Sequence, residues 1–183
     1  MMERITLGDK SFVPYIPYER ISEAIDQVAD RLNADYQDSE DTPVVLCILN
    51  GAILFCAELL KRLHFNLELS SVKLTSYCGT QSTGQVKTVG GLTTDLKGRR
   101  VIVVEDIVDT GQTIVAIRQL LEEAGVKESR ICALLLKPEV FCQKAPLDYV
   151  AMEIPNRFIV GFGLDYNELG RNLKDIYVLD DTQ

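Results

Sequence analysis

The sequence predicts an α/β fold: a mostly parallel, twisted β-sheet flanked by helices on both faces. Runs of apolar, largely β-branched residues alternate along the chain with stretches of helical periodicity, and this alternation is typical of parallel strands joined by helices. Acidic and hydroxyl residues cluster directly after one of these runs, at residues 105–113. Open α/β sheets bind their ligands at that end of the strands, so the cluster supports the same fold class.

The first elements precede the predicted core. Residues 1–18 include Pro14 and Pro17 and are expected to form an extended arm. An amphipathic helix should follow, because apolar residues recur there at helical intervals; they are Ile21, Ile25, Val28 and Leu32. Polar residues 35–42, closed by Pro43, then predict a loop.

Residues 44–49 are uniformly apolar and predict the first core strand, and residues 53–63 predict a helix. Residues 44–60, the apolar stretch that these elements share, fall short of a membrane span, which needs about 20 apolar residues. Asn50, Gly51 and Glu58 also interrupt them. We therefore interpret this stretch as a strand, a tight turn and a buried helix.

The chain then leaves the core. Val72 and Leu74 alternate with polar residues and predict a strand that leads outward. Residues 75–94 are rich in Ser, Thr and Gly. Loops of about 20 residues without evident structure are uncommon and often serve as functional lids.

The second half of the sequence continues the alternation. Residues 101–104 predict a strand buried on both faces. A helix should follow and stop near Gly125, because apolar residues recur at helical spacing before that glycine; they are Ile114, Ile117, Leu121 and Ala124. Further strands are expected over residues 131–136, 158–163 and 176–179.

The residues between the 101–104 strand and its helix have a specific chemistry. A helix amino terminus offers unpaired N–H groups, and the hydroxyls of Thr110 and Thr113 add donors, which suits a phosphate. The carboxylates of Glu105 and Asp106 would repel a phosphate but suit ribose hydroxyls or a hydrated magnesium ion. Asp109 lies between these groups. The pattern predicts a site for a phosphorylated sugar, with Asp109 placed to act on the group joined to it.

Two other interpretations fit part of this pattern. The acids could be solvated residues at the end of an ordinary strand, but three carboxylates and two threonines rarely crowd a buried strand's end without a function. A response-regulator receiver also gathers acids at strand ends, but it needs an acidic pair after its first strand. Here the first core strand ends in Asn50, Gly51 and Ala52.

The composition fits one globular domain over residues 1–183 and limits its partners. The chain is 46% apolar, which allows a substantial core, and its formal net charge is −8. That charge argues against nucleic-acid binding and against an anionic membrane surface, since both need clustered Lys and Arg. Backbone amides, a few cations and magnesium can still bind a polyanionic substrate locally.

The five cysteines include no C-x-x-C pair, and the amino terminus lacks the long apolar core of a signal peptide. No disulfide framework is therefore expected, and a reducing cytoplasm is the expected location. Cys47 and Cys132 lie in apolar runs and should be in the core, while Cys78 should be exposed. The single histidine, His64, argues against a zinc site built on imidazoles.

The segment Glu105-Asp106-Ile107-Val108-Asp109-Thr110-Gly111 resembles the phosphoribosyl pyrophosphate (PRPP) signature of type I phosphoribosyltransferases. Other segments resemble the 6-oxopurine branch of that family, hypoxanthine (guanine) phosphoribosyltransferase. In the family's order, these are Leu49-Asn50-Gly51-Ala52, Ser76-Tyr77, Gln81-Ser82-Thr83-Gly84, Leu136-Lys137, Phe158-Ile159-Val160-Gly161 and Leu164-Asp165-Tyr166-Asn167-Glu168 with Arg171. The resemblance implies the type I phosphoribosyltransferase fold, with a small hood and a flexible lid loop over residues 75–94.

The resemblance also implies an activity in purine salvage. Such an enzyme transfers the 5-phosphoribosyl group of PRPP to N9 of hypoxanthine, and also to that of guanine, giving IMP or GMP and pyrophosphate with Mg²⁺ as cofactor. The implied partners are these small molecules and further copies of the same chain, in a homodimer or homotetramer.

The family's roles can be carried to matching positions. Asp109 would be the general acid/base at purine N7, and Ser76 and Tyr77 would head the lid that excludes water. PRPP would contact the signature, the pyrophosphate loop and one arginine: Glu105, Asp106, Asp109, Thr110, Gly111, Gln112, Thr113, Leu49, Asn50, Gly51 and Arg171. In the family, the pyrophosphate loop contains a non-proline cis peptide.

The purine would be bound by residues from three other segments. The Lys137 amine would donate to O6, which favours oxopurines over adenine. Phe158 would stack on the base, and backbone groups near Ile159 would contact its edge. Asp165 would border this site and bind a second magnesium through water, while Glu105 and Asp106 would serve the first: the implied metal set is Glu105, Asp106 and Asp165.

Three positions, in two segments, depart from the family pattern. The pyrophosphate loop often has Lys and Gly where this chain has Asn50 and Ala52, so one cation is missing. Arg157 stands where several relatives have Lys, which keeps the charge but changes its geometry.

Two alternative functions stay open from the sequence. A xanthine-preferring phosphoribosyltransferase would share these motifs, because recognition of O2 depends partly on backbone geometry. A PRPP-sensing regulatory protein on the same fold would need a basic face or an added DNA-binding domain, whereas this chain is acidic. Asp109, Lys137 and the lid together favour the enzyme.

Overall fold

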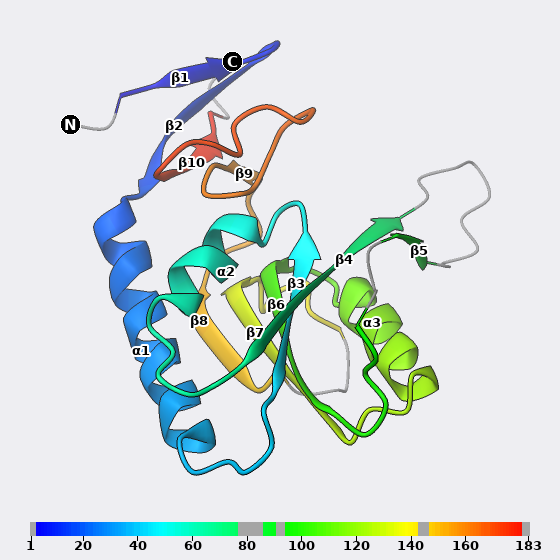
Figure 1. The fold of residues 1–183 in the computed structure, drawn as a ribbon. Coiled ribbons are helices and arrows are strands. Elements are labelled where there is room, and N and C mark those ends of the chain that lie inside the picture. The colour runs from blue at the N-terminus through cyan, green and yellow to red at the C-terminus, as the bar shows by residue number, and fades with distance from the viewer. Residues whose placement is uncertain (1–2, 77–85, 91–93, 143–146, 181–183) are drawn as a thin grey trace.

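The computed structural model describes residues 3–76, 86–90, 94–142 and 147–180, which form two β-sheets and three helices (Figure 1). The larger sheet of this part has the strand order β5-β4-β3-β6-β7-β8, and only the β4–β5 pair is antiparallel. Its strands are β3 (Val44–Leu49), β4 (Glu68–Ser76), β5 (Val86–Gly90), β6 (Arg100–Val108), β7 (Glu128–Leu136) and β8 (Tyr149–Glu153). The helices are α1 (Tyr18–Tyr36), α2 (Ile53–Leu60) and α3 (Gln112–Glu123).

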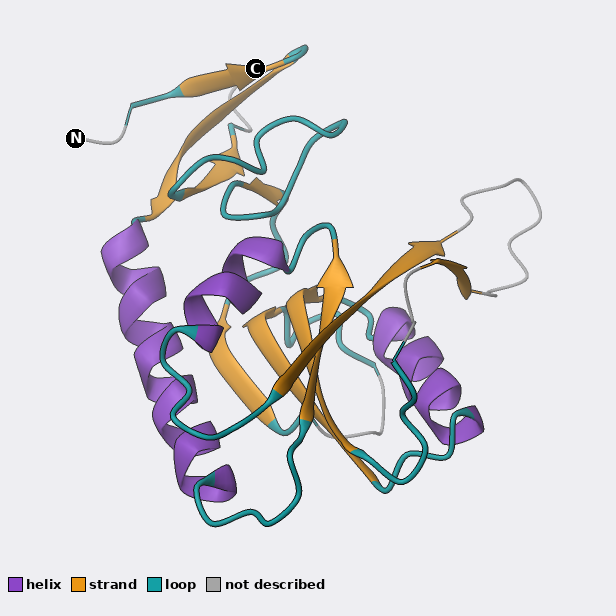
Figure 2. Ribbon diagram, viewed as in Figure 1, coloured by secondary structure: helices purple, strands orange, loops and turns teal. Residues whose placement is uncertain are grey.

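The larger sheet is covered on both faces, by α1 and α2 on one and by α3 on the other (Figure 2). Successive side chains of β6 point into opposite layers: Ile102 and Val104 pack with α1 and α2, while Val101 and Val103 pack with α3. A central strand between two helical layers needs apolar residues at every position. This burial explains why the run that predicted the strand is uniformly apolar. The predicted α/β fold class is confirmed.

A smaller antiparallel sheet, which we call the hood, lies beyond the carboxyl ends of the parallel strands (Figure 1). Its strand order is β1-β2-β10-β9, with β1 (Ile5–Leu7), β2 (Lys10–Ile16), β10 (Ile176–Leu179) and β9 (Ile159–Val160). The predicted extended arm over residues 1–18 is corrected to a β-hairpin, whose second strand pairs with the distant β10. Pro14 fits into β2 because the register with β10 shifts beside it.

Other predicted elements are present with different bounds. The 158–163 strand shortens to β9, because Gly161, Phe162 and Gly163 all have positive φ and turn the chain. The predicted lid loop over 75–94 contains the strand β5, while residues 77–85 and 91–93 lie outside the described ranges. β8 was not expected from the sequence.

No helix in the described ranges has both the length and the apolar character that crossing a membrane requires. Residues 44–60 form β3, a turn and α2, as the sequence predicted. Cys47 and Cys132 are buried in the core, as predicted.

Three backbone segments meet where the hood joins the larger sheet. Gly51, in the turn between β3 and α2, is so close to the end of β6 that a Cβ there would lie 1.7 Å from Asp106 Oδ2. On the other side, a Cβ at Gly163 would lie 2.0 Å from the Gly51 carbonyl oxygen. Neither position has space for a side chain, so the two glycines permit this contact between hood and sheet.

We predict that Gly163→Ala lowers the free energy of unfolding by about 3 kcal/mol or more, because the new methyl group would meet a backbone oxygen. Gly98→Ala is the matched control, since Gly98 also has a positive φ of +69° but no atom within 4 Å of its Cβ. It should cost only about 1 kcal/mol, from the left-handed backbone alone. Urea unfolding of both variants measures the difference, and equal losses would contradict the close contact.

Candidate active site

The end of β6 and the start of α3 enclose a pocket of about 230 Å³, lined by every residue from 105 to 114. Gly111 caps α3 with φ +82°, a conformation in which glycine is favoured. Val115 N donates to Gly111 O at 3.1 Å, so the N–H groups of residues 112–114 precede this helical bond. The pocket therefore has the amide donors and the positive dipole end that bind an anion.

Two carboxylates form the inner wall of this pocket. Glu105 is buried, and its Oε2 has no hydrogen-bond partner. Burial, together with the neighbouring Asp106, raises the pKa of Glu105 well above its ordinary value. Burial also raises the pKa of Asp106 to about 6, although Ile107 N donates to its Oδ1 at 2.8 Å.

An orphaned buried carboxylate oxygen fits a cation or a hydroxyl donor. In the described ranges no three Asp, Glu, His or Cys side chains converge on one point. Magnesium bound here would therefore take two carboxylates at most from this site, with other ligands from substrate and water, which is the usual arrangement for that ion. Glu105 and Asp106 fit magnesium in this limited sense.

Asp109 and Lys137 come from neighbouring strands and meet at the mouth of the pocket. The distance from Lys137 Nζ to Asp109 Oδ1 is 2.8 Å. The Lys137 side chain is 9% exposed and that of Asp109 is 50% exposed, so the pair joins a buried cation to a carboxylate that solvent reaches. Lys137 N also donates to Val108 O at 3.0 Å, which fixes the backbone beside the pair.

The turn after β3 reaches the same site. Its Leu49–Asn50 peptide is cis, as expected for the pyrophosphate loop. Asn50 is exposed, while Ala52 is fully buried and donates its N–H to Ile48 O at 3.2 Å. The alanine that replaces the family's usual glycine thus contributes to the core, and Gly51 beside it makes the close contact with Asp106.

Arg171 and Asp165 approach from the hood. Arg171 Nη2 lies 2.7 Å from Asp165 Oδ1, and Arg171 Nη1 donates to Gly163 O at 2.9 Å. Both side chains are close enough to Asp106 to affect its pKa, which Arg171 lowers and Asp165 raises. The structure therefore brings these two predicted residues to the acidic wall of the pocket.

The remaining predicted residues are placed as follows. Phe158 precedes β9 and is 45% exposed, whereas Ile159 is buried. Ser76 ends β4, and Tyr77 lies outside the described residues, as do Cys78 and the segment 81–84.

Sequence reasoning missed the steric role of Gly163 and the partners of Phe158. The sequence contains Gly-x-Gly at residues 161–163, but the apolar residues before it favour a strand. The ring of Phe158 packs against Phe12 and Tyr166, at centroid distances of 6.2 and 6.0 Å. No local pattern links Phe12 to Phe158, because their contact depends on the pairing of β2 with β10.

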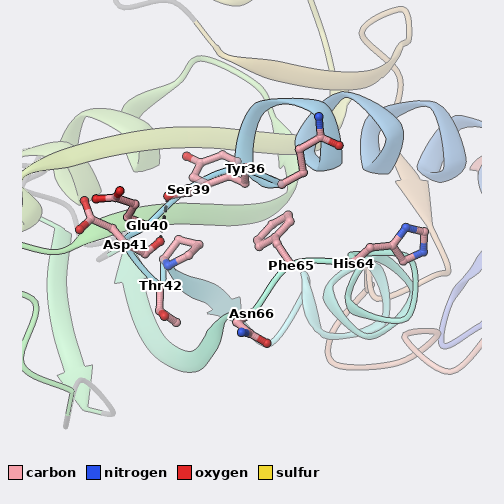
Figure 3. Close-up of a pocket in the computed structure, with 10 residues that line it drawn as sticks. Tyr36, Ser39, Glu40, Asp41, Thr42, His64, Phe65 and Asn66 are labelled. Atoms are coloured by element: carbon pink, nitrogen blue, oxygen red, sulfur yellow. Dashed lines mark hydrogen bonds between the residues drawn. The ribbon is translucent and has the colours of Figure 1, made fainter.

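A second hollow, of about 260 Å³, lies near the amino ends of β3 and β4. Tyr36 and Phe65 stack in it with ring centroids 5.3 Å apart. Figure 3 shows the side chains of Glu40 and Asp41 at one end, with His64 pointing away from them. None of the predicted site residues lines this hollow.

Comparison with known proteins identifies similar chains. Residues 17–167 match the phosphoribosyl transferase domain family. Hypoxanthine-guanine phosphoribosyltransferase of Streptococcus pneumoniae (strain ATCC BAA-255 / R6) is 39% identical over 165 residues, which cover 90% of this chain and 91% of that protein. A crystal structure of hypoxanthine phosphoribosyltransferase from Staphylococcus aureus superposes with a TM-score of 0.84 at 34% identity, covering 91% of this chain and 90% of that one. The Trypanosoma cruzi hypoxanthine phosphoribosyl transferase gives a TM-score of 0.86 at 29% identity, covering 96% of this chain and 95% of that one.

We predict that Asp106→Asn stabilises the unliganded protein in a pH-dependent way. Because the folded-state pKa of Asp106 is raised from 3.8 to about 6, its contribution to stability is fully present below pH 3.8 and is lost as pH rises through 6. The variant should therefore match wild type near pH 4 and be more stable at pH 8, by up to about 3 kcal/mol.

Urea unfolding at pH 4 and pH 8, in the presence of a chelator, measures this effect. Asp38→Asn is the control, since Asp38 is an exposed carboxylate outside the site, and it should change stability by less than about 0.5 kcal/mol at either pH. A loss of stability in Asp106→Asn that does not vary with pH would contradict the prediction.

Proposed function

This chain belongs to the hypoxanthine-guanine phosphoribosyltransferases of the phosphoribosyl transferase domain family, and we propose that it transfers the 5-phosphoribosyl group of PRPP to N9 of hypoxanthine and guanine. The products are IMP or GMP and pyrophosphate. The observation that carries the proposal is the contact of 2.8 Å between Asp109 and Lys137 at the mouth of the pocket. These side chains provide an acceptor and a donor side by side, which the 6-oxopurine edge requires.

PRPP binds, in this proposal, across the pocket formed by residues 105–114. Its 5′-phosphate accepts hydrogen bonds from the amide groups at the start of α3 and from the hydroxyls of Thr110 and Thr113. The ribose hydroxyls donate to the carboxylates of Glu105 and Asp106. The unpartnered Oε2 of Glu105 supports this assignment, because a buried acceptor without a donor is costly until a ligand supplies one.

The base is recognised through O6 and N7, which are adjacent on the purine. Lys137 donates to O6, and Asp109 accepts the hydrogen on N7. Both members of the ion pair therefore contact the base. N9 then attacks C1 of the ribose, the C1–O bond to pyrophosphate breaks, and the N7 proton passes to Asp109. Adenine is rejected, because its 6-amino group would place a donor against the donors of Lys137.

The leaving pyrophosphate is bound by the turn over residues 49–51 and by Arg171. Magnesium, held by Glu105 and Asp106 with a second site at Asp165, would neutralise charge on PRPP and its product. Ser76 and Tyr77 would head a lid that excludes water from the reacting carbon, within a single domain that spans the chain.

We also propose that the chain assembles as a homodimer or homotetramer. An apolar groove of about 530 Å³ beside α2 and β4 supports this, since Ile53 and Leu69 at this groove are 49% and 58% exposed. Sedimentation velocity would refute the proposal by showing only the 20.5 kDa chain. A cytoplasmic location is proposed as well, supported by the thiols of Cys47, Cys56 and Cys132, which form no disulfide.

The test of the function is nucleotide formation from PRPP and magnesium with hypoxanthine, guanine, xanthine, adenine and uracil offered separately. Hypoxanthine and guanine should be converted, while adenine and uracil stay inert. Faster conversion of xanthine would replace the proposal with a xanthine-preferring enzyme. Binding of PRPP without conversion of any base would replace it with a PRPP sensor.

We predict that Asp109→Asn lowers kcat about 10²–10⁴-fold, which is the usual contribution of a general base. The affinity for PRPP should change little, because the amide groups of α3 and the inner carboxylates remain. Stopped-flow turnover and calorimetric titration with PRPP separate the two quantities. A variant that loses PRPP binding but turns over normally at saturation would exclude Asp109 as the base, and Asp38→Asn again serves as control.

A further inference from the structure

Three aromatic rings gather in the hood around Phe158, the residue that stacks on the base in the proposed function. Phe12 on β2 is fully buried, and its ring centroid lies 6.2 Å from that of Phe158 and 6.2 Å from that of Tyr166. Phe158 and Tyr166 meet edge to face, with an interplanar angle of 90° and centroids 6.0 Å apart. Such pairs add stability beyond the area that they bury. Phe158 is the exposed member of this cluster.

The ammonium group of Lys10 contacts two of these rings. Its Nζ lies 5.1 Å from the centroid of Tyr166 and 5.9 Å from that of Phe158, within the range of a cation–π interaction. Lys10 and Phe12 are two residues apart on β2, so their side chains lie on the same face of the hood sheet. Both therefore reach Phe158 from the hood, and the Phe158 side chain is still 45% exposed.

A hydrogen bond fixes the turn that precedes Lys10. The Tyr166 hydroxyl donates to Asp9 Oδ1 at 2.7 Å. The bond lowers the pKa of the Asp9 carboxyl and raises that of the Tyr166 hydroxyl. Gly8 lies in this turn beside Asp9, and a Cβ there would contact the Tyr166 ring at 3.7 Å. The β1–β2 turn is thus attached to the same segment that carries Asp165 and Arg171.

We propose that Lys10 is a positioning residue for the purine base, because its ammonium group holds the Phe158 ring in the orientation that stacks on the base. The inference rests on the stacking role of Phe158 in the proposed function. A half-exposed ring loses rotational freedom when a base binds against it. Lys10 reduces that cost by fixing the ring beforehand from its hood side.

Binding of two ligands that differ only in the base tests the proposal without turnover. Lys10→Met keeps the length and apolar character of the side chain but removes the charge. It should weaken IMP binding in calorimetry by about two- to five-fold, the size of an exposed cation–π contact. Ribose 5-phosphate has no base to stack, so its affinity should not change. Lys10→Arg should restore the wild-type affinity for IMP.

Lys174→Met is the matched control. Lys174 Nζ lies 5.4 Å from the ring centroid of Tyr18, so this change also removes a cation–π contact, at a ring that does not contact Phe158. It should leave the affinities for IMP and ribose 5-phosphate unchanged. In steady state, Lys10→Met should raise the KM for hypoxanthine by the same factor as the IMP dissociation constant, with kcat and the KM for PRPP unaltered.

Unchanged IMP affinity in Lys10→Met would overturn the inference, and so would an equal loss for IMP and ribose 5-phosphate, which would indicate general damage to the site. Failure of the proposed function has a different signature. In that case the wild-type protein itself would neither bind IMP nor convert hypoxanthine.

Discussion

The site depends on the close contact at Gly51. The turn after β3 is held between the Asp106 side chain and the backbone at Gly163, with no space for a side chain at either glycine. This contact joins the hood to the ends of the parallel strands. Arg171 and Asp165, on the hood segment that follows Gly163, thereby reach the acidic residues of β6. A wider separation would leave the anion pocket intact but would take Arg171 and Asp165 away from its acidic wall.

The electrostatics of the site oppose the stability of the unliganded chain. An acidic protein with a formal net charge of −8 buries Glu105 and places Asp106 beside it, and the pKa of each is raised. Lys137 and Arg171 are already paired with Asp109 and Asp165. The inner carboxylates therefore gain most from a ligand that brings its own cation and hydroxyl groups. Active sites commonly trade stability for function in this way.

Much of this arrangement could be predicted from local sequence, and the rest depends on long-range pairing. Strand β10 has the predicted bounds, and the acidic cluster does line one pocket. The cis peptide expected from the family resemblance is present at Leu49–Asn50. The β1–β2 hairpin was not predicted, because its partner β10 is remote in sequence. Positive φ at residues 161–163 ended a predicted strand, and apolar periodicity does not report φ. The ligand roles of the site residues stay predictions.

The pairing of β2 with β10 has a consequence for how the chain matures on the ribosome. The strands of the larger sheet all lie within residues 44–153, so that sheet can assemble while later residues are still being added. The hood cannot be completed at that stage, because β2 pairs with β10, which follows every other strand in the sequence. The phosphate pocket can therefore exist on a nascent chain before the hood completes the aromatic cluster around Phe158. The phosphate pocket and the aromatic cluster would therefore form at different times during synthesis.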